Sequence, residues 1–164
     1  MADIQPFRGS RYSLSADTDF GELLCPPYDI ISPELQSVLH QRNPYNAIRL
    51  EFGLNLHTDS SNDNRYTRSA GLLREWLDQK VLLTEDTPAI YILQENFMYG
   101  GRLMTRRSIL AVVRLEEFSK GVIIPHEETS QGPKRDRMEL LEATKANLSP
   151  IMAIYRDQNK QIGS

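Results

Sequence analysis

The densest group of chemically capable side chains lies between residues 125 and 137, in the sequence PHEETSQGPKRDR. A polar loop leads there into a helix that we expect from Pro133 to about Ala146. Lys134 and Arg135 fall in the first turn of this helix, where the positive end of the helix dipole disfavours cations. A bound phosphate would reverse that effect, because free helix N–H groups and basic side chains would both contact it.

This pattern predicts an anion site, and the residues that we expect to bind a phosphate are Gly132, Lys134, Arg135 and Arg137. The spacing is not that of a Walker loop, which requires G-x-x-x-x-G-K-[ST]. The alternative is a solvated helix start, at which Asp136 compensates the basic side chains locally.

Three further residues are candidates for acid–base chemistry. His126 and Glu127 precede the loop, and a histidine beside a carboxylate can transfer protons or hold a metal. Asp29 follows Pro26 and Pro27, which stiffen the chain and favour a rigidly presented catalytic carboxylate or magnesium ligand. The alternatives are a solvated polar loop for His126 and Glu127, and a turn-capping role for Asp29. We expect Asp29 and the His126–Glu127 segment to line one polar cleft.

Local sequence patterns predict the helices and strands that would position these residues. Ser32 and Pro33 predict a helix start that ends at Asn43-Pro44. An apolar stripe predicts a second helix from about Asp63 to Lys80. Short strands are expected at three places, which are Ala47–Phe52, Val122–Ile124 and Ile151–Tyr155.

The strongest local pattern is a β-hairpin. Ala89–Phe97 and Leu103–Leu115 are rich in strand-forming residues, and Gly100-Gly101 between them permits the positive φ of a tight turn. Glu95 is expected to pair across the strands with Arg106 or Arg107. The fold prediction is therefore a single α+β domain, with a mixed sheet, a central antiparallel hairpin and about three helices.

Composition limits the classes of function. The 164 residues and 40% hydrophobic content suit one soluble domain, and 19 basic against 22 acidic residues leave a net charge of −3. This acidic balance argues against a nucleic-acid partner. Residues 100–164 carry 11 basic and 8 acidic side chains, a local net charge of +3, so they can still hold an anion. We expect a cytoplasmic protein with no membrane segment and no signal peptide, in which Cys25 is a small buried apolar residue.

Several motifs resemble one bacterial and archaeal domain-of-unknown-function family, number one thousand and fifteen, whose members are sometimes labelled ParB/RepB-like. The resemblance runs in order along nearly the whole chain, through IQPFRG, PPYDIIS, NPYN, Arg65-Tyr66, PHE and GPK-x-DR. It implies a longer protein, of which residues 1–164 are the N-terminal part.

A weaker resemblance connects the chain to the ParB/sulfiredoxin-like superfamily, which includes nucleotide switches and kinases of free serine. It implies nucleotide binding at the Gly132–Arg137 junction, although Pro133 and Asp136 depart from the usual ParB motif. The leading hypothesis is a phosphotransferase for a small hydroxyl-bearing metabolite, which uses ATP or ADP and Mg²⁺. Asp29 or Glu127 would be the base, with His126 nearby. The alternatives are a ParB-like nucleotide or DNA-binding module without catalysis, and a scaffold domain.

Overall fold

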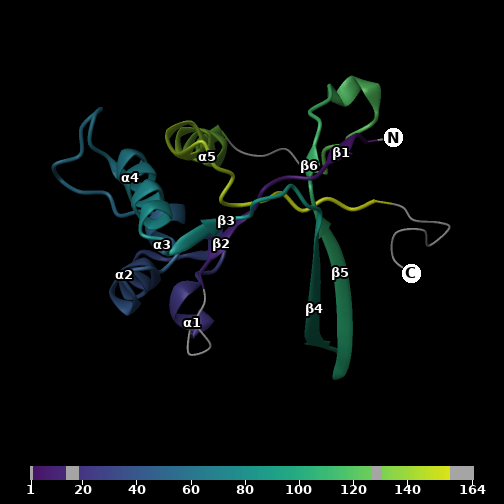
Figure 1. The fold of residues 1–164 in the computed structure, drawn as a ribbon, viewed down its shortest axis with the longest axis horizontal. Helices are drawn as coiled ribbons and strands as arrows, with labels where there is room; N and C mark the ends of the chain where they lie inside the picture. Colours follow the sequence, from purple (N-terminus) through teal and green to yellow (C-terminus); the bar gives the residue numbers. More distant parts are fainter. Residues whose placement is uncertain (1, 14–18, 127–130, 156–164) are drawn as a thin grey trace. The chain divides into compact units, whose positions relative to one another are not determined.

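A computed structural model of the chain describes residues 2–13, 19–126 and 131–155 (Figure 1). The chain divides into two compact units. Unit 1 comprises Met1–Ser10, Thr84–Glu128 and Met152–Ser164, and unit 2 comprises Arg11–Leu83 and Thr129–Ile151. Two of the passages of the chain between the units fall in β2 (Ser10–Tyr12) and β3 (Leu82–Thr84), which pair with each other.

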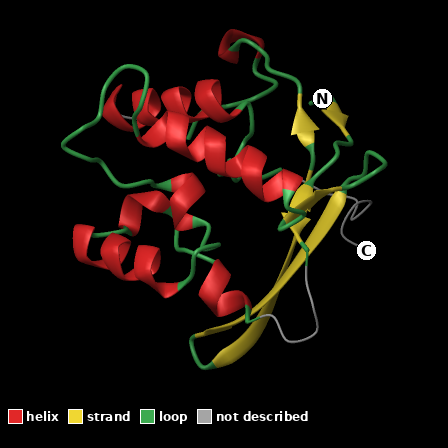
Figure 2. Cartoon of the chain, turned by 60° about the vertical axis from the view of Figure 1, so that its left-hand side comes forward, coloured by secondary structure: helices red, strands yellow, loops and turns green. Residues whose placement is uncertain are grey.

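Unit 2 is built mainly from helices (Figure 2). Its described residues form five α-helices and one 3-10 helix, which are α1 (Phe20–Leu23), η1 (Tyr28–Ile30), α2 (Pro33–Arg42), α3 (Ile48–Glu51), α4 (Arg65–Asp78) and α5 (Gln131–Thr144). The two long helices predicted before residue 80 are confirmed. The Ser32 hydroxyl caps α2 by accepting from the Leu35 N–H at 3.2 Å. Asn64 and Thr67 form a reciprocal capping box at the start of α4.

The core of unit 2 has two apolar clusters. Trp76 is the largest fully buried side chain, and it packs with Leu50, Leu73 and Leu82. The second cluster contains Ile31, Leu39 and Ile48, with partly buried Cys25 packed against it. The α4 face predicted from the apolar stripe therefore supplies much of the core.

The strand predicted at Ala47–Phe52 is wrong, because this segment contains helix α3. A short apolar run does not by itself distinguish a strand from a buried helical turn. The deciding contacts come from Asn46, whose side chain accepts from the Ile48 N–H at 3.0 Å. Its amide also donates to the Glu22 and Leu24 carbonyls, at 2.7 and 3.1 Å.

Unit 1 holds the predicted β-hairpin, which is confirmed. β4 (Tyr91–Tyr99) and β5 (Arg102–Leu110) pair antiparallel, and Gly100 and Gly101 have φ of 56° and 76°. Two positive φ values in a two-residue turn match the twist of the flanking strands. Glu95 pairs with Arg106 through two hydrogen bonds of 2.8 and 2.9 Å, as expected.

The remaining short elements of unit 1 differ in part from the prediction. β1 (Ile4–Gln5) pairs with β6 (Val112–Val113), and η2 (Phe118–Lys120) is a 3-10 helix. The strands predicted at Val122–Ile124 and Ile151–Tyr155 are wrong. Strand propensity produces a strand only where a neighbouring strand accepts the backbone, and the described residues offer these segments none.

The architecture is therefore α+β, as predicted, with small antiparallel sheets. Instead of about three α-helices, the described residues form five, because α1 and α3 have only four residues each and carry no helical period. Within the part of the chain that the structure describes, no helix combines the length and the apolar character needed to cross a membrane.

Asn46 provides a test of this fold. Its side chain is fully buried and bonds three backbone groups, so Asn46→Ala should lower the free energy of unfolding by about 3 kcal/mol. Urea unfolding of unmodified and variant chains measures this loss. Asn62→Ala, at an exposed position of the same unit, is the matched control and should change stability by less than about 0.5 kcal/mol. Equal stability of the two variants would contradict the role of Asn46.

Candidate functional site

Arg137, on α5, makes polar contacts with residues from distant parts of unit 2. Its Nη1 donates to Glu51 Oε1 at 2.7 Å, and its Nη2 donates to the Glu51 carbonyl at 3.1 Å. Its Nε donates to Asp136 Oδ2 at 2.9 Å. The guanidinium carbon also lies 3.9 Å from the centroid of the Tyr28 ring, which is a cation–π contact. One side chain therefore connects α5 with α3 and η1.

Asp136 is the second carboxylate that Arg137 contacts. Its Oδ1 accepts from the Tyr66 hydroxyl at 2.8 Å and from Arg65 Nη2. Burial disfavours the charged carboxylate, but hydrogen bonds from Arg137 and Tyr66 and the charges of Arg137 and Arg65 outweigh burial. The pKa of Asp136 consequently lies below its ordinary value, and the carboxylate is ionised at neutral pH.

The charges of the cluster balance. Glu51 is a buried carboxylate that Arg137 and the Ser149 hydroxyl hold, and Arg65 stacks on the Tyr66 ring at 4.8 Å. Two guanidinium groups therefore face two carboxylates, with aromatic rings around them. We call these residues the ionic cluster, and they are Glu51, Arg65, Asp136 and Arg137. Buried charges persist only when they are paired in this way.

The space enclosed by the ionic cluster is narrow. It is lined by Glu51, Phe52, Gly53, Arg65, Tyr66, Arg137 and Leu140, and it leaves no room for a ligand. A ligand of this region would therefore bind on its outside, at the solvent-exposed residues of α5 or η1.

The exposed part of α5 carries two of the predicted phosphate-binding residues. Lys134 is exposed, and the Arg135 side chain is 83% exposed and donates to Glu139 Oε1 at 2.7 Å. Gly132 lies within α5 rather than in a loop before it, because the helix already includes Gln131. Pro133 permits this earlier start, since the first-turn N–H groups of a helix have no intrahelical partner to lose.

The structure assigns Arg137 a different environment from Lys134 and Arg135. Four of its five N–H donors are already directed to Glu51 and Asp136, so at most one Nη1 N–H is left for a phosphate. The phosphate role that we predicted for Arg137 stays a prediction.

The predicted acid–base residues are distributed over the two units. Asp29 is exposed in η1 of unit 2, directly after Tyr28. His126 is exposed and belongs to unit 1, and Glu127 lies outside the described residues. The expected cleft shared by Asp29 and the His126–Glu127 segment stays a prediction.

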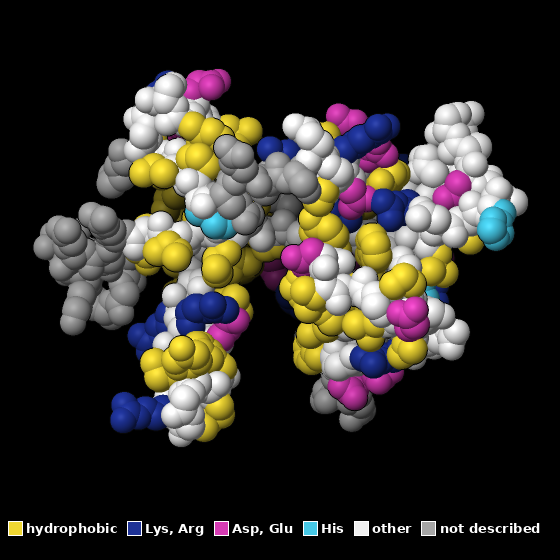
Figure 3. Space-filling model, turned by 180° about the vertical axis from the view of Figure 1, so that it is seen from behind, with side chains coloured by type: hydrophobic (Ala, Val, Ile, Leu, Met, Phe, Trp, Pro, Cys, Tyr) yellow, Lys and Arg dark blue, Asp and Glu magenta, His cyan; other side chains and the backbone are white. Residues whose placement is uncertain are grey.

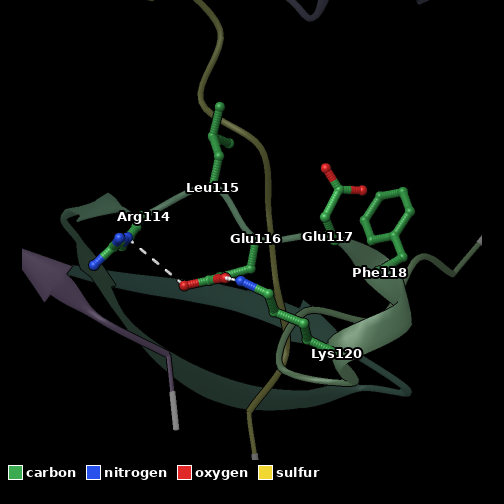
Figure 4. A pocket seen from close by; sticks show the side chains of 6 residues that line it. All are labelled: Arg114, Leu115, Glu116, Glu117, Phe118 and Lys120. Carbon is green, nitrogen blue, oxygen red and sulfur yellow. Dashed lines mark hydrogen bonds and ion pairs between the residues drawn. The ribbon is translucent and has the colours of Figure 1, made fainter.

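Two other features of the described residues are not candidate sites. Burial and the nearby Glu51 charge raise the pKa of Cys25 to about 11, which fits the apolar role expected for this thiol. In unit 1, Glu116 lies between Arg114 and Lys120 (Figure 4) and pairs with them at 3.7 and 2.5 Å, in the lining of a shallow surface hollow. Across the described ranges, no group of three His, Cys, Asp or Glu side chains is arranged to hold a metal ion.

Sequence reasoning did not find the roles of Glu51, Tyr66 and Ser149. Glu51 follows an apolar run, and no local pattern relates it to Arg137, 86 residues further along the chain. One signal was available, because Arg65 places a basic group at a helix start that has no acidic residue in its first turn. Such a cation requires a partner from elsewhere, and Asp136 supplies it.

Residues 4–164 match the model of a family described as protein of unknown function (DUF1015). The chain belongs to this family. No significant match is found among curated proteins or solved structures. Three motifs that carried the family resemblance, around Tyr28, Arg65 and Arg137, come together in and around the ionic cluster.

The lowered pKa of Asp136 provides a pH test. At pH values between the pKa of Asp136 in the folded chain and its higher pKa in the unfolded chain, the unfolded chain binds more protons. The contribution of Asp136 to the free energy of unfolding is therefore complete above about pH 4, and it is lost as the pH falls through the folded pKa. Asp136→Asn should cost about 3 kcal/mol at pH 7, because two arginines lose a shared carboxylate. Its stability should also fall less steeply in acid than that of the unmodified chain.

Urea titrations from pH 7 to pH 2 measure both effects. Asp78→Asn, at an exposed position in α4, should keep the acid slope of the unmodified chain. An Asp136→Asn variant with that same slope would show that Asp136 is not held in its ionised form.

Proposed function

We propose that unit 2 binds ATP or ADP through its phosphates and takes part in phosphoryl transfer to the hydroxyl of a small metabolite, such as a hydroxy amino acid. The observation that carries this proposal is the contact between Arg137 and Tyr28, at 3.9 Å. This contact joins Tyr28, the residue before Asp29, to α5, the helix that also carries Lys134 and Arg135. A carboxylate and a phosphate-binding surface are the two parts that a phosphotransferase needs side by side.

Lys134 and Arg135 are the residues of α5 best suited to contact phosphate oxygens. Both side chains are exposed, and Arg135 pairs with Glu139 on the surface of the same helix. Exposed ion pairs are weak, so a phosphate with several charged oxygens can replace Glu139. The ionic cluster behind them holds α5 in place while they bind.

Asp29 would receive the hydroxyl proton of the metabolite. The hydroxyl oxygen then attacks the terminal phosphorus of ATP, the bond from that phosphorus to the bridging oxygen breaks, and ADP leaves. A bound Mg²⁺ would neutralise phosphate charge. Magnesium commonly keeps phosphate oxygens and water as ligands beside one or two carboxylates, and Asp29 is the carboxylate that we propose for this role.

Calorimetric titration with MgATP or MgADP tests the binding surface. Lys134→Ala and Arg135→Ala should each weaken binding by roughly 10- to 100-fold, the effect of a lost hydrogen bond to a charged group. Both variants should keep the fold, because neither side chain is buried. Arg74→Ala is the matched control, since it removes the same charge from an exposed position of α4 and should leave the affinity unchanged.

A second measurement separates transfer from binding. Asp29→Asn should bind nucleotide like the unmodified chain but lose phosphoryl transfer to a panel of hydroxyl-bearing metabolites. Nucleotide binding with no transfer by the unmodified chain would instead favour the ParB-like nucleotide-binding module. Equal affinity of Lys134→Ala, Arg135→Ala and Arg74→Ala would contradict the phosphate site.

A further inference from the structure

Helix α5 is separated in the sequence from the rest of unit 2. Unit 2 begins with the segment Arg11–Leu83, and the chain then passes through unit 1 before it reaches α5. The buried members of both apolar clusters come from that first segment, between Ile31 and Leu82. Within the part of the chain that the structure describes, both clusters are therefore formed without a buried residue of α5.

The sequence and the apolar packing of α5 stabilise it only weakly. Lys134 and Arg135 lie in its N-terminal half, and Glu139 and Glu142 lie in its C-terminal half, an order that opposes the helix dipole. Its one buried residue is Leu140. Helix α4 has the same length and a similar order of charges, but it buries four residues and begins with a capping box. A 14-residue helix such as α5 is marginal in water when it stands alone.

The ionic cluster attaches α5 to the first segment of unit 2. Arg137 contacts Glu51 and Tyr28, and Asp136 contacts Arg65. On one face of the molecule, several Lys and Arg side chains lie beside Asp and Glu side chains (Figure 3), and exposed pairs of this kind are weak. The charged side chains of the ionic cluster differ from them, because they are only 9% to 22% exposed. Separation of these charges restores their hydration, which offsets part of the pairing energy that is lost.

We propose that α5 undocks from unit 2 as a unit while the two apolar clusters stay folded. A single buried residue, an unfavourable order of charges and an ionic attachment are the properties of a segment that opens at a lower free energy than the whole unit. This inference goes beyond the proposed function and does not depend on it. For that function, undocking would separate Lys134 and Arg135 from the Asp29 segment, so the site would be complete only while α5 is docked.

Hydrogen exchange of the full chain at pH 7, followed by mass spectrometry of its peptides, tests the undocking. In the unmodified chain, the amides of α5 should be at least about 10-fold less protected than those of α4. Arg137→Gln should accelerate exchange in α5 at least about 10-fold more, because it removes the charge that pairs with Glu51 and stacks on Tyr28. Arg74→Gln, at an exposed position of α4, is the matched control and should leave exchange in α5 unchanged.

A substitution in the core distinguishes undocking from global unfolding. Leu39 is 2% exposed and belongs to the cluster with Ile31 and Ile48. Leu39→Ala lowers the free energy of global unfolding, so it should accelerate exchange in α4 at least about 10-fold. Exchange in α5 should stay unchanged, because undocking does not open this cluster. Leu39→Val, a smaller change at the same position, provides the same comparison if Leu39→Ala does not fold.

Three results would overturn the proposal. Equal protection of α4 and α5 in the unmodified chain would show that the two helices open only together. Equal acceleration of both helices in Leu39→Ala would show that α5 opens only through global unfolding. If Arg74→Gln accelerated exchange in α5 as much as Arg137→Gln, the overall charge of the chain would control α5 instead of the ionic cluster.

Discussion

The packing of unit 2 depends on one requirement, the neutralisation of the buried Glu51 carboxylate. Arg137 meets it from α5, with a side-chain bond of 2.7 Å and a second bond to the Glu51 carbonyl. The same guanidinium holds Asp136 and stacks on Tyr28, so three distant parts of the chain are joined at one group. Loss of one partner would leave a buried charge unpaired, which strongly destabilises the folded state.

This requirement gives one basic residue of α5 a structural role, in contrast to the two basic residues that we propose bind a ligand. Arg137 faces inward and donates to Glu51 and Asp136, whereas Lys134 and Arg135, three and two residues earlier, are exposed to solvent. The three basic residues look equivalent in the sequence, but their surroundings differ. A ligand at this surface would thus be held by residues whose replacement leaves the fold intact, next to a cluster that keeps the helix and the Asp29 segment in place.

Local signals predicted the elements that depend on local interactions. The Ser32 cap and the Gly100-Gly101 turn act within a few residues, and both are present as expected. The strand prediction for Ala47–Phe52 failed because the helix there depends on Asn46, which bonds to backbone carbonyls more than 20 residues away. The ionic cluster could not be predicted for the same reason, since its pairs span 71 and 86 residues. The one signal in the sequence was Arg65, a basic residue at a helix start that has no acidic residue in its first turn.

The central claim is that the Tyr28–Asp29 segment is held against α5 through Arg137. A double-mutant cycle with Tyr28→Leu and Arg137→Gln measures this contact directly, through the free energies of unfolding of four chains. We predict a coupling free energy of about 1 kcal/mol, the size of a partly buried cation–π interaction. Additive effects of the two substitutions, within about 0.3 kcal/mol, would contradict it.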